Sequence, residues 1–285
     1  MSVFFEELVL KAKELNTNLT RIAVMESGSQ PECSDLAPAA ICMNSYSVAK
    51  LFTAAAIGVC CDEGLLNTNE RIVDILNDYL PVEYDKRFDM MTVDMALRHY
   101  CGFKSSYLDI DVADLNPVTS GDYLKYLFKT RLENTPGTVY CYSDAAFYLL
   151  SRVVTQKSGC ALDDFLWQKL LYPMGFREMA FSHCPKGYAM GATGLYINTL
   201  DMVKLPMLYI DKGMWQGKRL LSEDWINKSL ERGYALTVTD HSAFYKGGMY
   251  GQIVLALPEQ KRAVAWHSVK SADTKELINW AINYK

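Results

Sequence analysis

Ser47-Val48-Ala49-Lys50 leads directly into Leu51-Phe-Thr-Ala-Ala-Ala-Ile-Gly-Val-Cys60, an apolar run rich in good helix formers. The run predicts a buried helix. A helix that begins here places Ser47 and Lys50 on one face, one turn apart, at its N-terminal end. A neutral lysine can accept the serine proton, and a helix N-terminus favours developing negative charge. The stretch therefore predicts a nucleophile with its base, and the alternative is a serine N-cap followed by a surface lysine.

Composition narrows the class of protein. The chain has 285 residues, of which 50% are hydrophobic and 22% charged, so it can form one large globular domain or two interleaved ones. The net charge of -4 and the absence of a lysine- or arginine-rich run predict no nucleic-acid partner. The first ten residues lack a basic region and a long apolar region, and no stretch reaches 18 apolar residues. We expect a cytoplasmic protein without a membrane span.

Cysteine and histidine spacing argues against a metal site. The eight cysteines show no C-x-x-C pair, and the four histidines do not cluster in the sequence. The length of the chain and the lack of a secretion signal argue against a disulfide framework. We therefore expect free, mostly buried thiols, no metal and no cofactor.

The order of predicted elements indicates the fold class. Strands are predicted at both ends of the chain, with mainly helices between them. Predicted strands cover 21–26, 39–43, 234–239, 251–257 and 262–266; predicted helices cover 2–15, 51–64, 92–99, 119–130, 145–157, 161–171, 199–210, 223–230 and 273–284. This pattern predicts an α+β fold (an α/β sandwich), with an antiparallel sheet built from both termini, flanking helices and an inserted all-helical region. We expect residues 1–46 and 185–285 to form the sheet domain, 47–184 the helical region, and the cleft between them the active site.

Two further motifs supply what a serine nucleophile needs. Such a serine requires a second proton-handling group and polar groups that stabilise negative charge on the acyl oxygen. Tyr142-Ser143-Asp144 lies at a loop-to-helix junction, where its side chains can project into a cleft. Lys246-Gly247-Gly248 precedes the predicted strand at 251–257, and its glycines permit close approach of a substrate backbone.

The order S-x-x-K, Y-x-[N or D], K-x-G resembles the serine β-lactamase and penicillin-binding-protein superfamily. The chain is most similar to the branch that holds class C β-lactamases, D-alanyl-D-alanine carboxypeptidases and related esterases. The resemblance covers nearly the whole chain. It includes the nucleophile helix ending at Leu66, the segment 92–103 with His99, the segment 136–150, Tyr172 to Phe176, and 194–201.

The resemblance implies a β-lactamase/transpeptidase-like fold and a role for each motif residue. Ser47 would form the acyl-enzyme, Lys50 would be its general base, and Tyr142 would relay protons. The oxyanion hole would use backbone N–H groups of Ser47 and of Met249 or Tyr250. The implied substrate is a small ester, amide or peptide, contacted by Asp144, Lys246, Gly247, Gly248 and Met249.

The motifs also depart from the family pattern. Asp144 stands where class C enzymes have asparagine, and an ionised aspartate only accepts hydrogen bonds. A carboxylate also tends to keep Lys50 protonated, whereas burial beside a positive charge such as Lys246 would lower the lysine pKa. The third motif, Lys246-Gly247-Gly248, offers no hydroxyl to a substrate carboxylate. His267, in Trp266-His-Ser268, is a second candidate for the position of this motif in the site. The alternative is that His267 is only a polar residue at a strand end.

Two functional hypotheses follow. The first is a serine hydrolase of carboxypeptidase, esterase or amidase type that forms an acyl-enzyme on Ser47, with weak or no β-lactamase activity. The second is a non-catalytic ligand-binding protein on the same scaffold. Ser-Lys-Tyr defines the reaction class but not the substrate, because specificity depends on loops and pockets.

Overall fold

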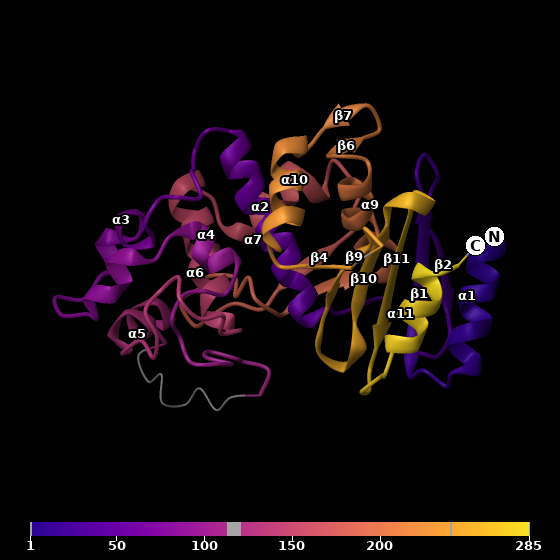
Figure 1. The fold of residues 1–285 in the computed structure, drawn as a ribbon, viewed down its shortest axis with the longest axis horizontal. Helices are drawn as coiled ribbons and strands as arrows, with labels where there is room; N and C mark the ends of the chain where they lie inside the picture. Colours follow the sequence, from indigo (N-terminus) through magenta and orange to yellow (C-terminus); the bar gives the residue numbers. More distant parts are fainter. Residues whose placement is uncertain (1, 113–120, 240, 285) are drawn as a thin grey trace. The chain divides into compact units, whose positions relative to one another are not determined.

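The computed structural model describes residues 2–112, 121–239 and 241–284 (Figure 1). The chain divides into two compact units, one formed by 1–48, 171–180 and 195–285 and the other by 49–170 and 181–194. These bounds differ from the predicted ones at three places. Ser47 and the segment 171–180 belong to the first unit rather than to the helical region, and residues 185–194 belong to the second unit rather than to the sheet domain.

The first unit contains a six-stranded antiparallel sheet with strand order β2-β1-β11-β10-β9-β8. Its strands are β1 (Leu19–Glu26), β2 (Glu32–Asp35), β8 (Thr237–Val238), β9 (Phe244–Gly247), β10 (Ile253–Leu257) and β11 (Arg262–Ser268). The central pair joins the two ends of the chain, because β1 lies against β11 with Ile22 opposite Trp266. The predicted α+β class, with a sheet built from both termini, is confirmed.

Helices cover both faces of this sheet (Figure 1). Successive strand residues point to opposite faces, so each strand contributes to two cores. On one face, large side chains pack against α1 (Val3–Glu14) and α11 (Lys275–Ile282); they include Ile22, Val24, Leu255, Val264 and Trp266. The intervening residues of β1 and β11 include the small Ala23, Ala263 and Ala265, and these strands contact α8 (Thr199–Met202) and α9 (Lys204–Ile210).

Smaller elements complete the first unit. They are β3 (Cys42–Asn44), β5 (Leu195–Asn198) and β4 (Met179–Phe181) in a second sheet, the hairpin β6 (Met214–Trp215) and β7 (Lys218–Arg219), α10 (Glu223–Arg232), and the short turns η1 (Tyr46–Val48), η5 (Met249–Gly251) and η6 (Pro258–Gln260).

The second unit is helical, and α2 and α6 form its centre. Its helices are α2 (Ala49–Asp62), α3 (Ile72–Ile75), η2 (Asn77–Tyr79), η3 (Lys86–Met90), α4 (Val93–Leu97), α5 (Tyr123–Lys129), α6 (Asp144–Ser158), α7 (Leu162–Leu166) and the π-helical turn η4 (Trp167–Leu171). Helix α6 contacts α2, α3, α4 and α7. Residues 49–60 of α2 are all buried, which explains why this helix is apolar on every side rather than amphipathic.

Some elements differ from the sequence expectation. Strands β2, β4, β5 and β9 were not predicted, because each is at most four residues long and lacks a clear apolar alternation. The strand expected over 234–239 is reduced to β8, since Ala235 has a φ of 57°. Of the helix predicted over 119–130, residues 119 and 120 lie outside the described part. The described helix α5 starts after Asp122, whose side chain accepts from Lys125 N–H at 3.0 Å.

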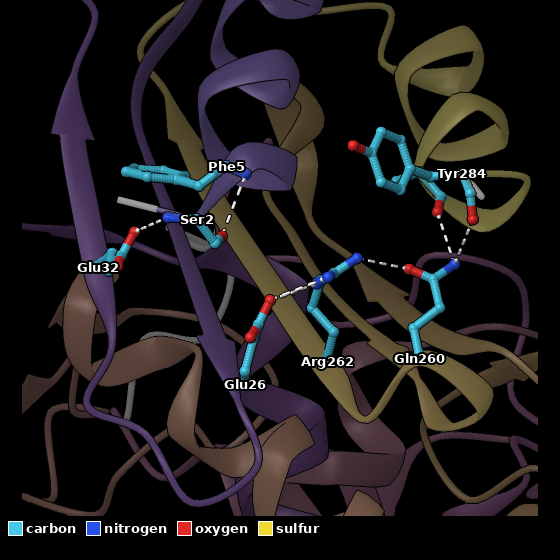
Figure 2. A network of polar contacts seen from close by, with 8 residues as sticks. Ser2, Phe5, Glu26, Glu32, Gln260, Arg262 and Tyr284 are labelled. Carbon is cyan, nitrogen blue, oxygen red and sulfur yellow. Dashed lines mark hydrogen bonds and ion pairs between the residues drawn. The ribbon is translucent and has the colours of Figure 1, made fainter.

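Arg262 links the central strands to the C-terminal helix. Figure 2 shows its guanidinium between Glu26 and Gln260, with a 2.9 Å hydrogen bond to each side-chain oxygen. The Gln260 amide donates in turn to the carbonyls of Ala281, Ile282 and Tyr284, at 3.2 to 3.4 Å. The guanidinium also lies 3.9 Å from the centre of the Phe4 ring. One side chain therefore joins β1, β11, α1 and the end of α11.

We expect Arg262→Ala to lower the free energy of unfolding by about 2 kcal/mol, since it removes charge-assisted hydrogen bonds and a cation–π contact. Urea unfolding monitored by tryptophan fluorescence measures the effect. Lys218→Ala is the matched control, because Lys218 is exposed on the β6–β7 hairpin. Equal midpoints for the two variants would show that the Arg262 contacts do not stabilise the first unit.

Candidate active site

Ser47 lies in a tight turn immediately before α2. The turn η1 is held at its start by two hydrogen bonds: Asn44 Oδ1 accepts from Tyr46 N–H at 2.8 Å, and Leu195 O accepts from Ser45 N–H at 2.8 Å. Ser47 is half-buried there. The sequence predicted a helix that begins at the serine. In the structure the serine sits in a 3₁₀ turn, and the α-helix follows from Ala49.

The K-x-G motif lies against this turn within the first unit. Lys246 and Gly247 are the last residues of β9, opposite Val254 and Ile253 of β10, so the motif is part of a strand rather than only preceding one. Gly248 follows, and a Cβ there would overlap the Ser45 carbonyl oxygen and lie 3.3 Å from Ser47 N. Glycine is therefore required at 248 by close backbone approach. Four of the predicted substrate-binding residues (Lys246, Gly247, Gly248 and Met249) thus belong to the same unit as Ser47.

Lys50 is fully buried in the second unit, in the first turn of α2. Its Nζ donates to Asp144 Oδ1 at 2.7 Å and to Ala192 O at 2.9 Å, and it lies 4.7 Å from the centre of the Tyr142 ring. Burial lowers the pKa of Lys50, but the Asp144 charge, the Tyr142 hydroxyl and hydrogen bonds to both outweigh it. The net result is a pKa raised above the ordinary lysine value. Lys50 is therefore an ammonium at neutral pH in this arrangement.

Tyr142 and Asp144 are positioned by the loop that precedes α6. Asp144 is the first residue of α6, where a carboxylate is favoured by the helix dipole. Tyr142 O accepts from Ser106 N–H at 2.7 Å, and the His99 ring lies 4.4 Å from the Tyr142 ring, centre to centre. The predicted residues Lys50, Tyr142 and Asp144 thus lie together within the second unit.

Two carboxylates beside Asp144 were not found from the sequence. Carboxylate oxygens of Asp109, Asp111 and Asp144 lie within 4.8 Å of one another, and Thr193 Oγ1 donates to Asp111 at 2.5 Å. Burial raises the pKa of both Asp109 and Asp111, and the Asp144 charge raises each further. Among the described residues, these three carboxylates form the group whose geometry could hold a metal ion. The sequence predicted no metal site. In the structure the Lys50 ammonium, which pairs with Asp144, provides a positive charge beside these carboxylates. The only sequence signal was the spacing D-x-D in a segment without periodicity.

His267 is buried in β11, where Nδ1 lies 2.8 Å from Thr199 Oγ1 of α8. Burial and the positive charge of Arg21 lower the pKa of His267 to about 3, so the ring is neutral. The His267 ring lies where β11 packs against α8. This position fits the alternative interpretation, in which His267 is a polar residue near a strand end.

The chain belongs to the Beta-lactamase family, whose sequence model matches residues 42–283. Solved structures of related proteins share its fold. An octameric penicillin-binding protein homologue from Pyrococcus abyssi superposes with a TM-score of 0.74 at 19% identity, covering 99% of this chain and 77% of that one. A class C β-lactamase from Rhodobacter sphaeroides gives a TM-score of 0.72 at 12% identity, covering 99% and 98%.

Among curated sequences, one relative is the "Putative D-alanyl-D-alanine carboxypeptidase" of Salmonella agona (strain SL483). It is 23% identical over 237 residues, which cover 78% of this chain and 54% of the relative. Homologues of the same name from other Salmonella strains are 24% identical over 241 residues. The chain thus spans about half the length of the curated relatives it matches. No helix in the described part of the chain has the length and apolarity needed to span a membrane.

Proposed function

We propose that the protein is a serine hydrolase that forms an acyl-enzyme on Ser47. Family membership and the carboxypeptidase name of the relatives support hydrolase activity. The observation that carries the proposal is the buried Lys50, which contacts Tyr142 and Asp144 and follows Ser47 by three residues. A lysine that is buried with two proton-handling neighbours and follows a half-buried serine by three residues in the sequence suits nucleophilic catalysis better than a structural role.

The proposed reaction has two steps. Ser47 Oγ attacks the acyl carbon; the new Oγ–C bond forms, the bond to the leaving group breaks, and the hydroxyl proton passes through Lys50 and Tyr142 to the leaving group. Water then attacks the ester, giving the acid and restoring the serine hydroxyl. Lys50 can accept a proton only after losing its own. Because Asp144 raises the lysine pKa, we expect the acylation rate to increase with pH through the alkaline range.

The proposed substrates are small esters, amides or peptides that end in a D-amino acid. The last class is suggested by the carboxypeptidase name of the relatives. Asp144 accepts hydrogen bonds but cannot donate one to a substrate amide carbonyl while ionised. We therefore expect β-lactams to be turned over weakly or not at all.

Incubation with a fluorescent penicillin and with p-nitrophenyl acetate, followed by peptide mass spectrometry, tests this function. We expect an acyl adduct on Ser47 from the ester. Ser47→Ala should lower ester turnover by at least about 10³-fold, since loss of a nucleophile in related triads costs that much or more. Ser242→Ala, an exposed serine of the first unit, is the control and should retain full activity. Absence of an adduct with either reagent would contradict the proposal.

A second candidate is a non-catalytic binding protein on the same scaffold. The observation that favours it is the Lys50–Asp144 ion pair, which keeps the lysine charged at neutral pH. Equilibrium binding of D-alanyl-D-alanine to wild type and to Ser47→Ala, together with the turnover assay, distinguishes the two candidates. Equal affinity with no turnover in either form would support the binding protein.

A further inference from the structure

The side chains of two tyrosines at the Ser47 turn form a pair to which no role has been assigned. The rings of Tyr46 and Tyr250 are 5.2 Å apart, centre to centre, and meet edge to face at 74°. Both residues belong to the first unit. Tyr46 immediately precedes Ser47, and Tyr250 follows Gly248 by two residues.

Both tyrosines occupy backbone conformations that large side chains rarely adopt. The φ angle is 49° at Tyr46 and 61° at Tyr250, in the left-handed region. Such strain persists only where the surroundings impose it, and it concentrates at functional sites.

Each turn is held by contacts of its own. Asn44 Oδ1 accepts from Tyr46 N–H at 2.8 Å. In the other turn, Tyr250 O accepts from Ala272 N–H at 3.2 Å, and Gly251 O accepts from Trp266 Nε1 at 2.9 Å. Two separately held turns thus present the two rings in a prearranged geometry.

The pair is close to the candidate nucleophile and open to solvent. The backbone of Gly248 abuts the Ser45–Ser47 turn, so the Tyr250 turn and the Tyr46 turn meet beside Ser47. Tyr250 is 43% exposed, whereas Tyr46 is half-buried. A rigid aromatic surface therefore lies next to the serine, and only part of it is covered by protein.

We propose that Tyr46 and Tyr250 bind an aromatic or large apolar acyl group of the substrate and so determine specificity. The proposal rests on the acyl-enzyme function proposed above. An aromatic acyl group can stack on the exposed ring and remove apolar surface from water, whereas an acetyl group is too small to do so. The pair therefore selects among acyl donors with the same leaving group.

The test compares p-nitrophenyl phenylacetate with p-nitrophenyl acetate, because the shared leaving group cancels in the ratio of their kcat/KM values. Tyr250→Asn removes the ring, and asparagine tolerates a positive φ better than most residues. We expect the phenylacetate-to-acetate ratio to fall about tenfold in Tyr250→Asn. It should stay within twofold of wild type in Tyr250→Phe, which keeps the ring.

Tyr172→Asn is the matched control, since Tyr172 is a 69% exposed tyrosine of the same unit, and its ratio should equal that of wild type. Circular dichroism verifies that each variant is folded, and Tyr250→Gly replaces Tyr250→Asn if the latter is not, because glycine also removes the ring and adopts a positive φ without strain. An unchanged ratio in the ring-deleted variant, with Ser47 still acylated, would overturn this inference alone. Lack of acylation in the wild-type protein would overturn the proposed function itself.

Discussion

Lys50→Met will lower the free energy of unfolding by about 3–5 kcal/mol at pH 7, the usual cost of removing one partner of a buried ion pair. Methionine fills a similar volume, so little of this cost comes from packing. The cost is electrostatic, because Asp144 would remain buried beside Asp109 and Asp111 without the ammonium of Lys50. Guanidinium unfolding at pH 7 measures it.

Lys157→Met is the matched control for this prediction. Lys157 pairs with Glu70 in the same unit, but both side chains are partly exposed, so we expect a loss below about 1 kcal/mol. The double variant Lys50→Met with Asp144→Asn should recover most of the lost stability, since it removes both charges. A Lys50→Met loss no larger than that of Lys157→Met would contradict the buried-pair interpretation.

The ion pair also predicts opposite pH dependences. In the wild-type protein the raised pKa of Lys50 contributes stability that is complete below the unfolded-state value of about 10.4 and is lost as the pH rises through the folded-state pKa. In Lys50→Met the pKa values of Asp109 and Asp111 rise further, because the lysine charge that lowers them is gone. The variant therefore regains stability on acidification, when the cluster binds protons that the unfolded chain does not. Unfolding midpoints measured from pH 5 to pH 11 will show both trends.

Gly248→Ala will reduce the rate of Ser47 acylation by about 10²-fold, the loss that a displacement of roughly 1 Å produces at a reacting centre. The new Cβ overlaps the Ser45 carbonyl oxygen and lies 3.3 Å from Ser47 N, so the nucleophile turn has to move. The backbone at 248 is otherwise suited to alanine, with a φ of -123°. The effect therefore comes from the contact rather than from backbone strain.

Gly247→Ala provides a control one residue away. A Cβ at 247 meets nothing closer than Gln252 O at 3.9 Å, an ordinary van der Waals contact. A methyl group at 247 can obstruct a peptide backbone but leaves the nucleophile turn in place, so with the small acetyl ester we expect the acylation rate to stay within about threefold of wild type. Stopped-flow measurement of p-nitrophenol release gives both rates. Equal rates in the two variants would mean that contact with the Ser45–Ser47 turn does not position the nucleophile.

The fold was predictable where apolar patterning is long. The run Leu51–Cys60 predicted α2, and the strand signals at 21–26, 251–257 and 262–266 predicted the centre of the sheet. Strand β9 could not be predicted in this way. Its sequence Phe-Tyr-Lys-Gly is only four residues long and joins two strand-favouring aromatic residues to two residues that are depleted in strands, so pairing with β10 determines its conformation.

The candidate site was predictable from motif order rather than from local structure. The sequence left two opposed effects on Lys50 open: a carboxylate that keeps it protonated, and burial beside a positive charge that lowers its pKa. The 2.7 Å ion pair and the raised lysine pKa favour the first. The sequence could not predict that Asp109 and Asp111 lie beside Asp144, because only the tertiary fold brings their loop to the start of α6. The Tyr46–Tyr250 pair was hidden for the same reason, since about 200 residues separate two turns that share a close backbone contact.

The pairing of β1 with β11 has a consequence for biosynthesis. Thr20 donates to the carbonyl of His267 across 247 positions of sequence, so the sheet cannot close until the last strand has left the ribosome. Most of the helical unit, residues 49–170, is synthesised earlier, and each of its α-helices is closed by hydrogen bonds between residues four apart. During translation we therefore expect the helices to form first, while the edge of β1 that later pairs with β11 still lacks its partner strand. A nascent chain in that state is the form most exposed to aggregation and to chaperones.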